Sequence, residues 1–413
     1  MLVENQEKAV AKLSRLKAGC LFMQMGTGKT KVAIDLANLK NDYDYIVWIA
    51  PASLLRMKSY KDEIYKWKPI KSIKFWTVES LSMSDSRYLD LVNFVNKYKT
   101  FCIVDESITI KNVDSKRTKR LLSLWDKFNY RFILNGTPLT KSLMDLLPQI
   151  NFIHPKILSM TETQFANTFL VYKEDGYKPW RRWSKPANEK ALIEIIRPYI
   201  FDCELDLDVK LNEEDIDCYN TYIEQEEYKK VKDKFFKELE KDDDLNFFSM
   251  SQLFQHKYTI CEDKQEKLIA LLKQIKERKE KVIIYVKYLD EIEQLYKLNL
   301  VFSVLTGQEK NDLNDFKEDI DILVCTYGVG SFGLNLQFAN NIIFLSQTFD
   351  YKMKEQAKYR IYRTGQEKTC NIYNFYVDTG LEELIKMSLN KKEDTLINVK
   401  SFINNNKNYK DLL

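Results

Sequence analysis

Residues 19–38 read GCLFMQMGTGKTKVAIDLAN, and this stretch decides the fold class of the first third of the chain. GCLFMQM is an apolar run short enough to be a buried strand. The two glycines that follow suit a tight turn, and KVAIDLAN has helical spacing. A strand that turns directly into a helix is the start of a parallel strand–helix–strand unit. The stretch therefore predicts a parallel sheet covered by helices, with a tight loop at the carboxyl end of its strand.

The loop itself, MGTGKT, predicts a phosphate site. Gly26 and Gly28 would let backbone amides close on phosphate groups at the positively polarised start of a helix. Lys29 would reach the β- and γ-phosphates, and the Thr30 hydroxyl would hold Mg²⁺. The strict form of the pattern has a glycine where Met23 stands here. Helicase motors often relax that position, so the departure favours a helicase over a kinase.

A second apolar run, FCIVDES (101–107), ends in two carboxylates. Asp105 would bind Mg²⁺, and Glu106 would orient or deprotonate the attacking water. An acidic pair at a strand end is common and means little alone. Further along a chain that already has a GKT loop, it completes the set needed to hydrolyse a nucleoside triphosphate.

Apolar runs alternate with helical patterns twice along the chain, which predicts two α/β lobes with parallel sheets. Residues 156–262 have long charged helical stretches and few β-like runs, which predicts a helical connector. The predicted division is therefore lobe one in 1–155, the connector in 156–262, lobe two in 263–395 and a frayed tail in 396–413. The remaining runs expected to be strands are YIVWIAP (45–51), RFILNGT (131–137), KVIIYV (281–286), DILVCT (321–326), NIIFLS (341–346) and NIYNFYV (371–377). Helices are expected near 28–38, 54–66, 115–126, 264–278, 288–297, 352–363 and 381–390.

Composition limits the kinds of partner and the setting. The 64 basic and 60 acidic residues nearly cancel, so a polyanion would have to be held in a local groove and not by overall charge. Seven scattered cysteines without a C-x-x-C pair are typical of a reduced protein, and two histidines do not favour a zinc site. No apolar run is long enough to span a membrane, and the N-terminus lacks a signal-peptide core. We expect a protein of the cytoplasm, in a bacterial cell or a phage-infected host.

The order of motifs resembles that of superfamily 2 helicases and, within them, the Swi/Snf-type DNA translocases. The resemblance covers nearly the whole chain apart from 156–262 and the tail. Gln24 departs from it, because the family usually has an acidic residue at that place. The segments that carry the resemblance are APASLL (50–55) with EIYKW (63–67), DES, IKNVDSKRTKRL (110–121), RFILNGTPLTKSLMDLLPQINFIHP (131–155), LTG (305–307), GVGSFGLNL (328–336) and QAKYRIYRTGQ (356–366).

The resemblance implies two tandem RecA-like lobes that use ATP and Mg²⁺ and bind double-stranded DNA. Arg360 and Arg363, three residues apart on one predicted helical face, would bring positive charge to the γ-phosphate. Gln6 would read the adenine. The nucleotide-binding set implied by the resemblance is Gln6, Met25, Gly26, Thr27, Gly28, Lys29, Thr30, Gly333 and Gln356. The implied DNA-backbone contacts are Ser53, Lys111, Asn112, Lys116, Arg117 and Thr326.

These features predict an ATP-driven motor that moves along duplex DNA, most simply as a monomer. A strand-separating DNA or RNA helicase remains an alternative, although no wedge hairpin or strand-splitting domain is recognisable. A motor subunit of a larger DNA-processing complex, with a protein partner bound through 156–262, is a second alternative. An inactive ATP-binding relic is a third, and intact Lys29, Asp105, Glu106, Arg360 and Arg363 argue against it.

Overall fold

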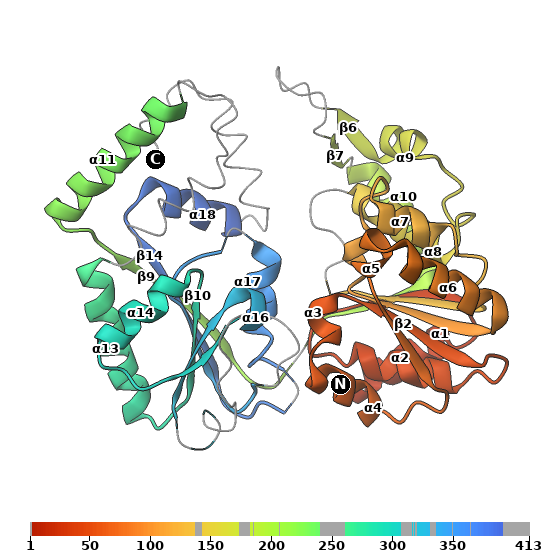
Figure 1. Cartoon of the computed structure of the whole chain (residues 1–413), viewed down its shortest axis with the longest axis horizontal. Helices are drawn as coiled ribbons and strands as arrows, with labels where there is room; N and C mark the ends of the chain where they lie inside the picture. The colour runs from red at the N-terminus through yellow and green to blue at the C-terminus, as the bar shows by residue number, and fades with distance from the viewer. Residues whose placement is uncertain are drawn as a thin grey trace. The chain divides into compact units, whose positions relative to one another are not determined.

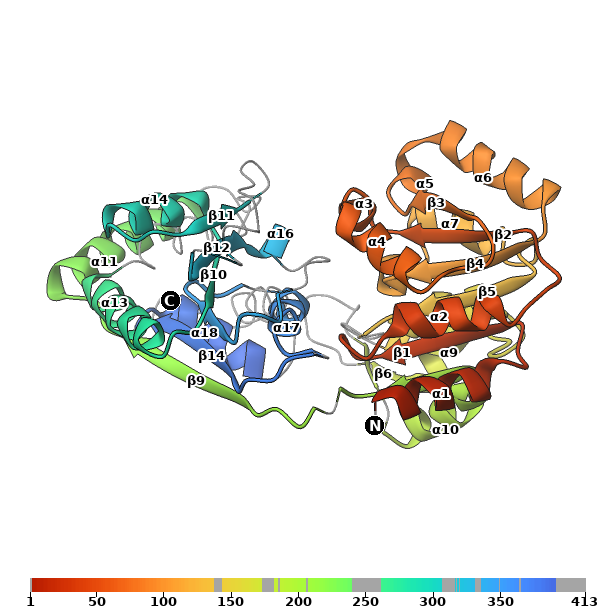
Figure 2. The ribbon, with the colours of Figure 1, turned by 90° about the horizontal axis from the view of Figure 1, so that it is seen from below.

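The computed structural model divides into two compact units, Met1–Asp206 and Leu207–Leu413, drawn in two orientations in Figures 1 and 2. Each unit is a parallel α/β domain, as predicted. The structure describes residues 2–136, 143–172, 182–184, 186–205, 207–239, 261–306, 316, 318, 320–330, 336–348, 350–363 and 365–390. Among these residues, no helix combines the length and the apolar character needed to cross a membrane.

The first unit is built on a six-stranded sheet with the strand order β3-β2-β4-β5-β1-β8, in which all neighbours are parallel. Figure 2 shows β3, β2, β4, β5 and β1 following one another across the unit. Because the strands are parallel, the loops after β1, β4 and β5 emerge at the same edge of the sheet. The strands are β1 (Ala18–Met23), β2 (Tyr45–Ala50), β3 (Ile73–Thr77), β4 (Thr100–Asp105), β5 (Tyr130–Leu134) and β8 (Ile200–Cys203).

Helices cover both faces of this sheet, with α1, α2 and α4 on one side and α5 to α8 on the other (Figure 1). The helix expected at 54–66 is divided, because Met57 has an extended backbone that ends one helix and caps the next. The first helices are α1 (Leu2–Leu13), α2 (Lys29–Asn38), α3 (Ala52–Leu55), α4 (Lys58–Lys66), α5 (Ser80–Met83), α6 (Asp85–Lys97) and α7 (Lys116–Leu122). After β5 come η2 (Leu143–Asp145), α8 (Leu146–Ile153), α9 (Glu162–Phe169), the β6–β7 hairpin (Leu170–Tyr172 and Arg182–Ser184), α10 (Pro186–Ile196) and η3 (Arg197–Tyr199).

The second unit has another six-stranded parallel sheet, in the order β11-β12-β10-β13-β14-β9. Alternate residues of its central strand enter two different cores: Val282 and Ile284 pack in one, and Ile283 and Tyr285 in the other. A strand buried on both faces explains the unbroken apolar run in the sequence. The strands are β9 (Leu211–Cys218), β10 (Val282–Val286), β11 (Ser303–Leu305), β12 (Ile322–Thr326), β13 (Asn341–Phe344) and β14 (Cys370–Val377). The helices are α11 (Tyr222–Leu239), α13 (Glu262–Glu277), α14 (Leu289–Lys297), α16 (Tyr327–Gly330), α17 (Tyr351–Lys358) and α18 (Gly380–Asn390).

The prediction of a separate helical connector at 156–262 is wrong for two of its segments. Strand β8 pairs with β1 at the edge of the first sheet, and β9 pairs along its whole length with β14 at the edge of the second. The segment is therefore shared between the two units. Its long charged helix is observed as α11. The predicted tail, 396–413, lies outside the described residues.

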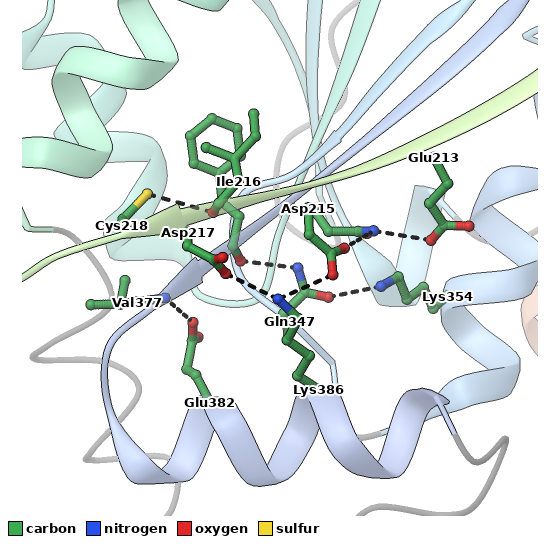
Figure 3. Close-up of polar contacts among 12 residues, drawn as sticks. Glu213, Asp215, Ile216, Asp217, Cys218, Gln347, Lys354, Val377, Glu382 and Lys386 are labelled. Carbon is green, nitrogen blue, oxygen red and sulfur yellow. Dashed lines mark hydrogen bonds and ion pairs between the residues drawn. The ribbon is translucent and has the colours of Figure 1, made fainter.

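Strand β9 was missed because its alternating residues are acidic where apolar ones would signal a strand. Glu213, Asp215 and Asp217 alternate along LNEEDIDC and meet lysines of two helices. Figure 3 shows the pairs that Asp215 and Asp217 form with Lys386. Lys358 of α17 lies 2.8 Å from Glu213. Lys386 of α18 bridges Asp215 at 3.1 Å and Asp217 at 3.0 Å. Side-chain ion pairs take the place of an apolar face on this edge strand.

Candidate nucleotide site and arginine pair

The loop after β1 has the backbone that its glycines were expected to allow. Gly26 and Gly28 have φ values of 82° and 86°, in the left-handed region that favours glycine. Gly28 caps α2, which begins at Lys29. A Cβ on Gly28 would also collide with the side-chain amide of Gln6, whose Nε2 donates to the Thr27 carbonyl at 3.0 Å. Gln6 therefore lies against the loop, as the nucleotide-binding prediction requires.

Lys29 folds back across this loop to the ends of two strands. Its Nζ donates to the carbonyls of Met23 at 2.9 Å and Gln24 at 3.3 Å. A Cβ on Gly136, just beyond β5, would lie 3.7 Å from the same Nζ. The ammonium group thus stands at the carboxyl edge of the sheet, where a bound phosphate would meet it. Thr30, the second residue of α2, is half-buried beside it.

The acidic pair stands at the end of β4, one strand beyond β5 in the sheet. Asp105 and Glu106 are each 7% exposed. Glu106 has φ 52° and ψ 53°, a strained conformation for a residue other than glycine and one that recurs at functional sites. Burial raises the pKa of the Asp105 carboxyl, the neighbouring Glu106 charge raises it further, and Lys29 opposes the rise. This buried pair would be stabilised by a cation, since opposite charge favours the ionised form.

The same residues fit a Mg²⁺ ion whose other ligands would come from a bound phosphate. Asp105 and the Thr30 hydroxyl offer the hard oxygen ligands that Mg²⁺ prefers. No cluster of three or more potential metal ligands (His, Cys, Asp or Glu) occurs among the described residues.

Two polar pairs around the acidic motif were not predicted. The Tyr60 hydroxyl of α4 donates a short hydrogen bond to Asp105 Oδ2. The buried Ser107 hydroxyl donates to Gln149 Oε1 of α8 at 2.6 Å. Both contacts join residues more than forty positions apart, so no local pattern in the sequence could have indicated them.

In the second unit the two arginines follow α17 and do not lie within it. The helix predicted for 352–363 ends at Lys358, and the chain continues in turns in which the Arg360 amide donates to Ala357 O and the Arg363 amide to Ile361 O. The prediction that both arginines share one face of a regular helix is wrong. Gln366 Nε2 holds these turns by donating to the carbonyls of Gln337, Ala339 and Ile361.

Of three further predicted nucleotide ligands, the structure describes two and not the third. Gln356 lies on α17 and is buried. Met25 packs close to Gly136 within the loop region. Gly333 lies outside the described residues, as do Thr137 to Ser142 of the segment RFILNGTPLTKSLMDLLPQINFIHP. The site residues of the first unit are brought together by the sheet edge, and the arginine pair is positioned within the second unit.

The predicted DNA contacts of the first unit fall in two places. Ser53 is exposed on α3, directly after β2. The other four, Lys111, Asn112, Lys116 and Arg117, surround the start of α7. Lys116 forms a 2.9 Å ion pair with Asp85, and the side-chain Oδ1 of Asn112 accepts from the Asp114 backbone amide. Thr326 ends β12 in the second unit. No structural feature tests these contacts, and they stay predictions.

A glycine loop, a lysine and an acidic pair at the carboxyl edge of a parallel sheet define the P-loop class of α/β proteins. The model of the SNF2-related domain matches residues 77–281, and that of the helicase conserved C-terminal domain matches residues 263–365. Together they span more than half of the chain. This chain belongs to the SNF2-type helicases of superfamily 2.

Known relatives are similar along most of this chain. An uncharacterized ATP-dependent helicase of Mycoplasma genitalium is 26% identical over 91% of this chain and 40% of its own length. Chromodomain-helicase-DNA-binding protein 1 of Gallus gallus is 25% identical over 89% of this chain and 25% of its own length. The chain therefore spans less than half the length of these relatives. A solved structure, the Sulfolobus solfataricus SWI2/SNF2 ATPase core in complex with dsDNA, is 18% identical with a TM-score of 0.42, covering 94% of this chain and 90% of that one.

Proposed function

We propose that this chain is a motor that hydrolyses ATP and uses the energy to translocate along double-stranded DNA. The observation that carries the proposal is that Lys29 and the Asp105–Glu106 pair stand at the same edge of one sheet, with the Lys29 charge acting on Asp105, beside a glycine loop that ends in a helix N-terminus. Membership of the SNF2-type helicases supports the same reading.

In the first unit, each polar group has a distinct part in the reaction. Lys29 would exchange its bonds to the Met23 and Gln24 carbonyls for bonds to the terminal phosphates of ATP. Thr30 and Asp105 would hold Mg²⁺, which supplies charge neutralisation on the phosphate oxygens. Glu106 would accept a proton from the attacking water or orient that water. Because phosphoryl transfer is mostly positioning and charge stabilisation, the buried carboxylates need a rigid support more than an unusual reactivity.

The second unit would contribute positive charge through Arg360 and Arg363. An arginine that reaches the transferring phosphoryl group is worth on the order of 10³–10⁵ in rate. The turns held by Gln366 would keep these side chains positioned on their own unit. Binding and hydrolysis of ATP would thereby couple the two units and shift their hold on the DNA.

The DNA partner is proposed from the family and from the name of one relative, which includes DNA binding. Contacts through Ser53, Lys111, Asn112, Lys116, Arg117 and Thr326 would be directed at the phosphate backbone. They would therefore be independent of sequence and sensitive to salt. A formal charge of only +4 is compatible with a local groove of this kind.

The test is the rate of ATP hydrolysis by the purified chain alone, with duplex DNA, with single-stranded DNA and with RNA. We expect strong stimulation by duplex DNA that the Lys29→Ala variant lacks. Displacement of a third strand from a DNA triplex would then test translocation directly. Stimulation by single strands or RNA alone would replace the proposal with a strand-separating helicase. Absence of stimulation by any of them would contradict DNA-driven activity of the chain by itself.

A further inference from the structure

A chain of hydrogen bonds reaches the predicted metal ligand from inside the first unit. Trp48 of β2 is fully buried, and its Nε1 donates to the Tyr60 hydroxyl at 3.0 Å. Tyr60 of α4 is 9% exposed and donates to Asp105 Oδ2. A strand and a helix thus form one chain of hydrogen bonds that ends at a single carboxylate.

The chemistry of these groups sets the direction of each bond. An indole nitrogen can only donate, so the Tyr60 oxygen must accept from Trp48. The single proton of Tyr60 is then directed to Asp105. The other carboxylate oxygen, Oδ1, accepts from the Glu106 amide at 2.9 Å. Both oxygens of Asp105 are therefore fixed, and each still has a lone pair for another ligand.

We propose that Tyr60 is a positioning residue for the metal–nucleotide complex, because its hydroxyl fixes the plane in which Asp105 presents its oxygens to Mg²⁺. This inference rests on the proposed ATPase function and deepens it. Tyr60 touches neither the nucleotide nor the metal; it acts through Asp105. Partners that orient metal ligands in this way typically change metal affinity or activity by roughly 10–100-fold when they are removed.

A merely structural role for the hydroxyl predicts a different result. Tyr60→Phe removes one oxygen and keeps the ring, so a structural hydroxyl would affect only the stability of the unit. Tyr43 offers a matched control in the same unit. It is 2% exposed, and its hydroxyl donates to the Ala37 carbonyl at 3.1 Å, away from the acidic pair. Tyr43→Phe therefore removes an equivalent buried hydrogen bond without touching Asp105.

The experiment compares the full chain with its Tyr60→Phe and Tyr43→Phe variants in two assays. The first is Mn²⁺ binding in the presence of a non-hydrolysable ATP analogue, followed by electron paramagnetic resonance. The second is DNA-stimulated ATP hydrolysis at varied Mg²⁺. For Tyr60→Phe we expect Mn²⁺ affinity about tenfold weaker and a similar rise in the Mg²⁺ needed for half-maximal rate. KM for ATP at saturating Mg²⁺ should stay within about twofold, because Lys29 and the glycine loop are unchanged.

The outcomes separate this inference from the function on which it rests. Wild-type metal dependence in Tyr60→Phe, or an equal loss in Tyr43→Phe, would overturn the positioning role and leave the ATPase intact. A wild-type chain that neither binds the metal with nucleotide nor hydrolyses ATP would overturn both. A loss confined to Tyr60→Phe, with melting temperatures of the two variants lowered alike, supports the inference.

Discussion

The side-chain carbonyl of Gln24 accepts a 2.6 Å hydrogen bond from the amide of Leu205. The backbone N–H of Gln24 donates to the Cys203 carbonyl at 2.9 Å, and this bond continues the pairing of β1 with β8. Gln24 is also the loop residue whose backbone carbonyl accepts from Thr27 Oγ1 and Lys29 Nζ. One residue thus joins the phosphate loop to the segment that ends the first unit.

Replacing Gln24 by leucine should loosen that segment, because the Leu205 amide would lose its acceptor. The cost of one such bond is about 1 kcal/mol, equivalent to roughly fivefold faster amide exchange at Leu205 if the segment opens locally. Hydrogen–deuterium exchange measures it. Gln24→Glu keeps an acceptor oxygen and is the control. Equal exchange in wild type and Gln24→Leu would show that the bond does not hold the segment.

Gly28→Ala should abolish nucleotide binding while the fold persists. An alanine would be strained at φ 86°, and its methyl group would strike the Gln6 amide. Binding of a fluorescent ATP analogue should fall beyond detection at concentrations that saturate the wild type. Gly328→Ala is the control, since a Cβ there meets no atom within 4 Å. Unchanged binding by Gly28→Ala would contradict the assigned loop geometry.

Arg363→Ala should lower the maximal rate of ATP hydrolysis by on the order of 10³-fold while nucleotide affinity changes little. Arg363 is only half-buried, whereas loss of the buried Arg360 would also disturb packing. Steady-state kinetics with duplex DNA provides the measurement. Arg278→Ala in the same unit, at a side chain 45% exposed, controls for lost charge. Similar kinetics for the two variants would remove Arg363 from the reaction.

Lys111→Ala and Lys116→Ala should each weaken duplex binding to a similar degree for every DNA sequence. Each should also reduce the slope of log affinity against log salt by about 1, as expected for one lost phosphate contact. Binding through Lys116 would exchange its ion pair with Asp85 for a contact with a phosphate. Fluorescence anisotropy over a salt series measures both. Lys12→Ala, on the exposed side of α1, should leave the slope unchanged; an equal change there would mean nonspecific attraction.

Lys354 should make the second unit more stable as the pH rises from about 8 to 10.5. Its side chain is 4% exposed, donates to Gln347 Oε1 at 3.1 Å and lies 5.2 Å from the Phe344 ring centre. Burial, with the charge of Lys358 adding to it, lowers the pKa of Lys354 to about 8 from 10.5. The unfolded chain therefore binds more protons within that window, and the free energy of unfolding rises with pH.

The Lys354→Met variant isolates this contribution, because other groups also titrate in alkali. Relative to Lys354→Met, the wild type should gain up to about 3 kcal/mol between pH 8 and 10.5. Urea unfolding at a series of pH values gives the difference. Lys230→Met, at an exposed position of α11, controls for lost charge. Parallel pH profiles for wild type and Lys354→Met would contradict the assignment.

Local patterns in the sequence predicted the central strands well. Strands β1, β2, β4 and β5 agree with their predicted runs because each is apolar on both faces and bounded by a turn. The short edge strand β3 was not predicted: its second residue, Lys74, is exposed, and the strand is only partly buried. Strand β9 was hidden by its acidic residues, whose neutralising lysines lie far along the chain.

The candidate site likewise has residues that local motifs predicted and contacts that they did not. Gly28, Lys29, Asp105 and Glu106 belong to compact motifs and were predicted from the residues alone. Tyr60 reaches Asp105 across 45 positions, and that contact exists only after β2, α4 and β4 are packed. The helix expected to include Arg360 and Arg363 was too long, because helical spacing alone does not indicate where hydrogen bonding changes to turns.

The position of Cys203 gives the phosphate loop a natural attachment point for a reporter group. All seven cysteines lie in the described part of the chain, and Cys203 is the one that is not fully buried. Its carbonyl bonds Gln24, and its thiol lies within reach of Thr27. A maleimide fluorophore added to the unmodified chain should therefore label one thiol first. Its emission would follow nucleotide entry without any engineered residue.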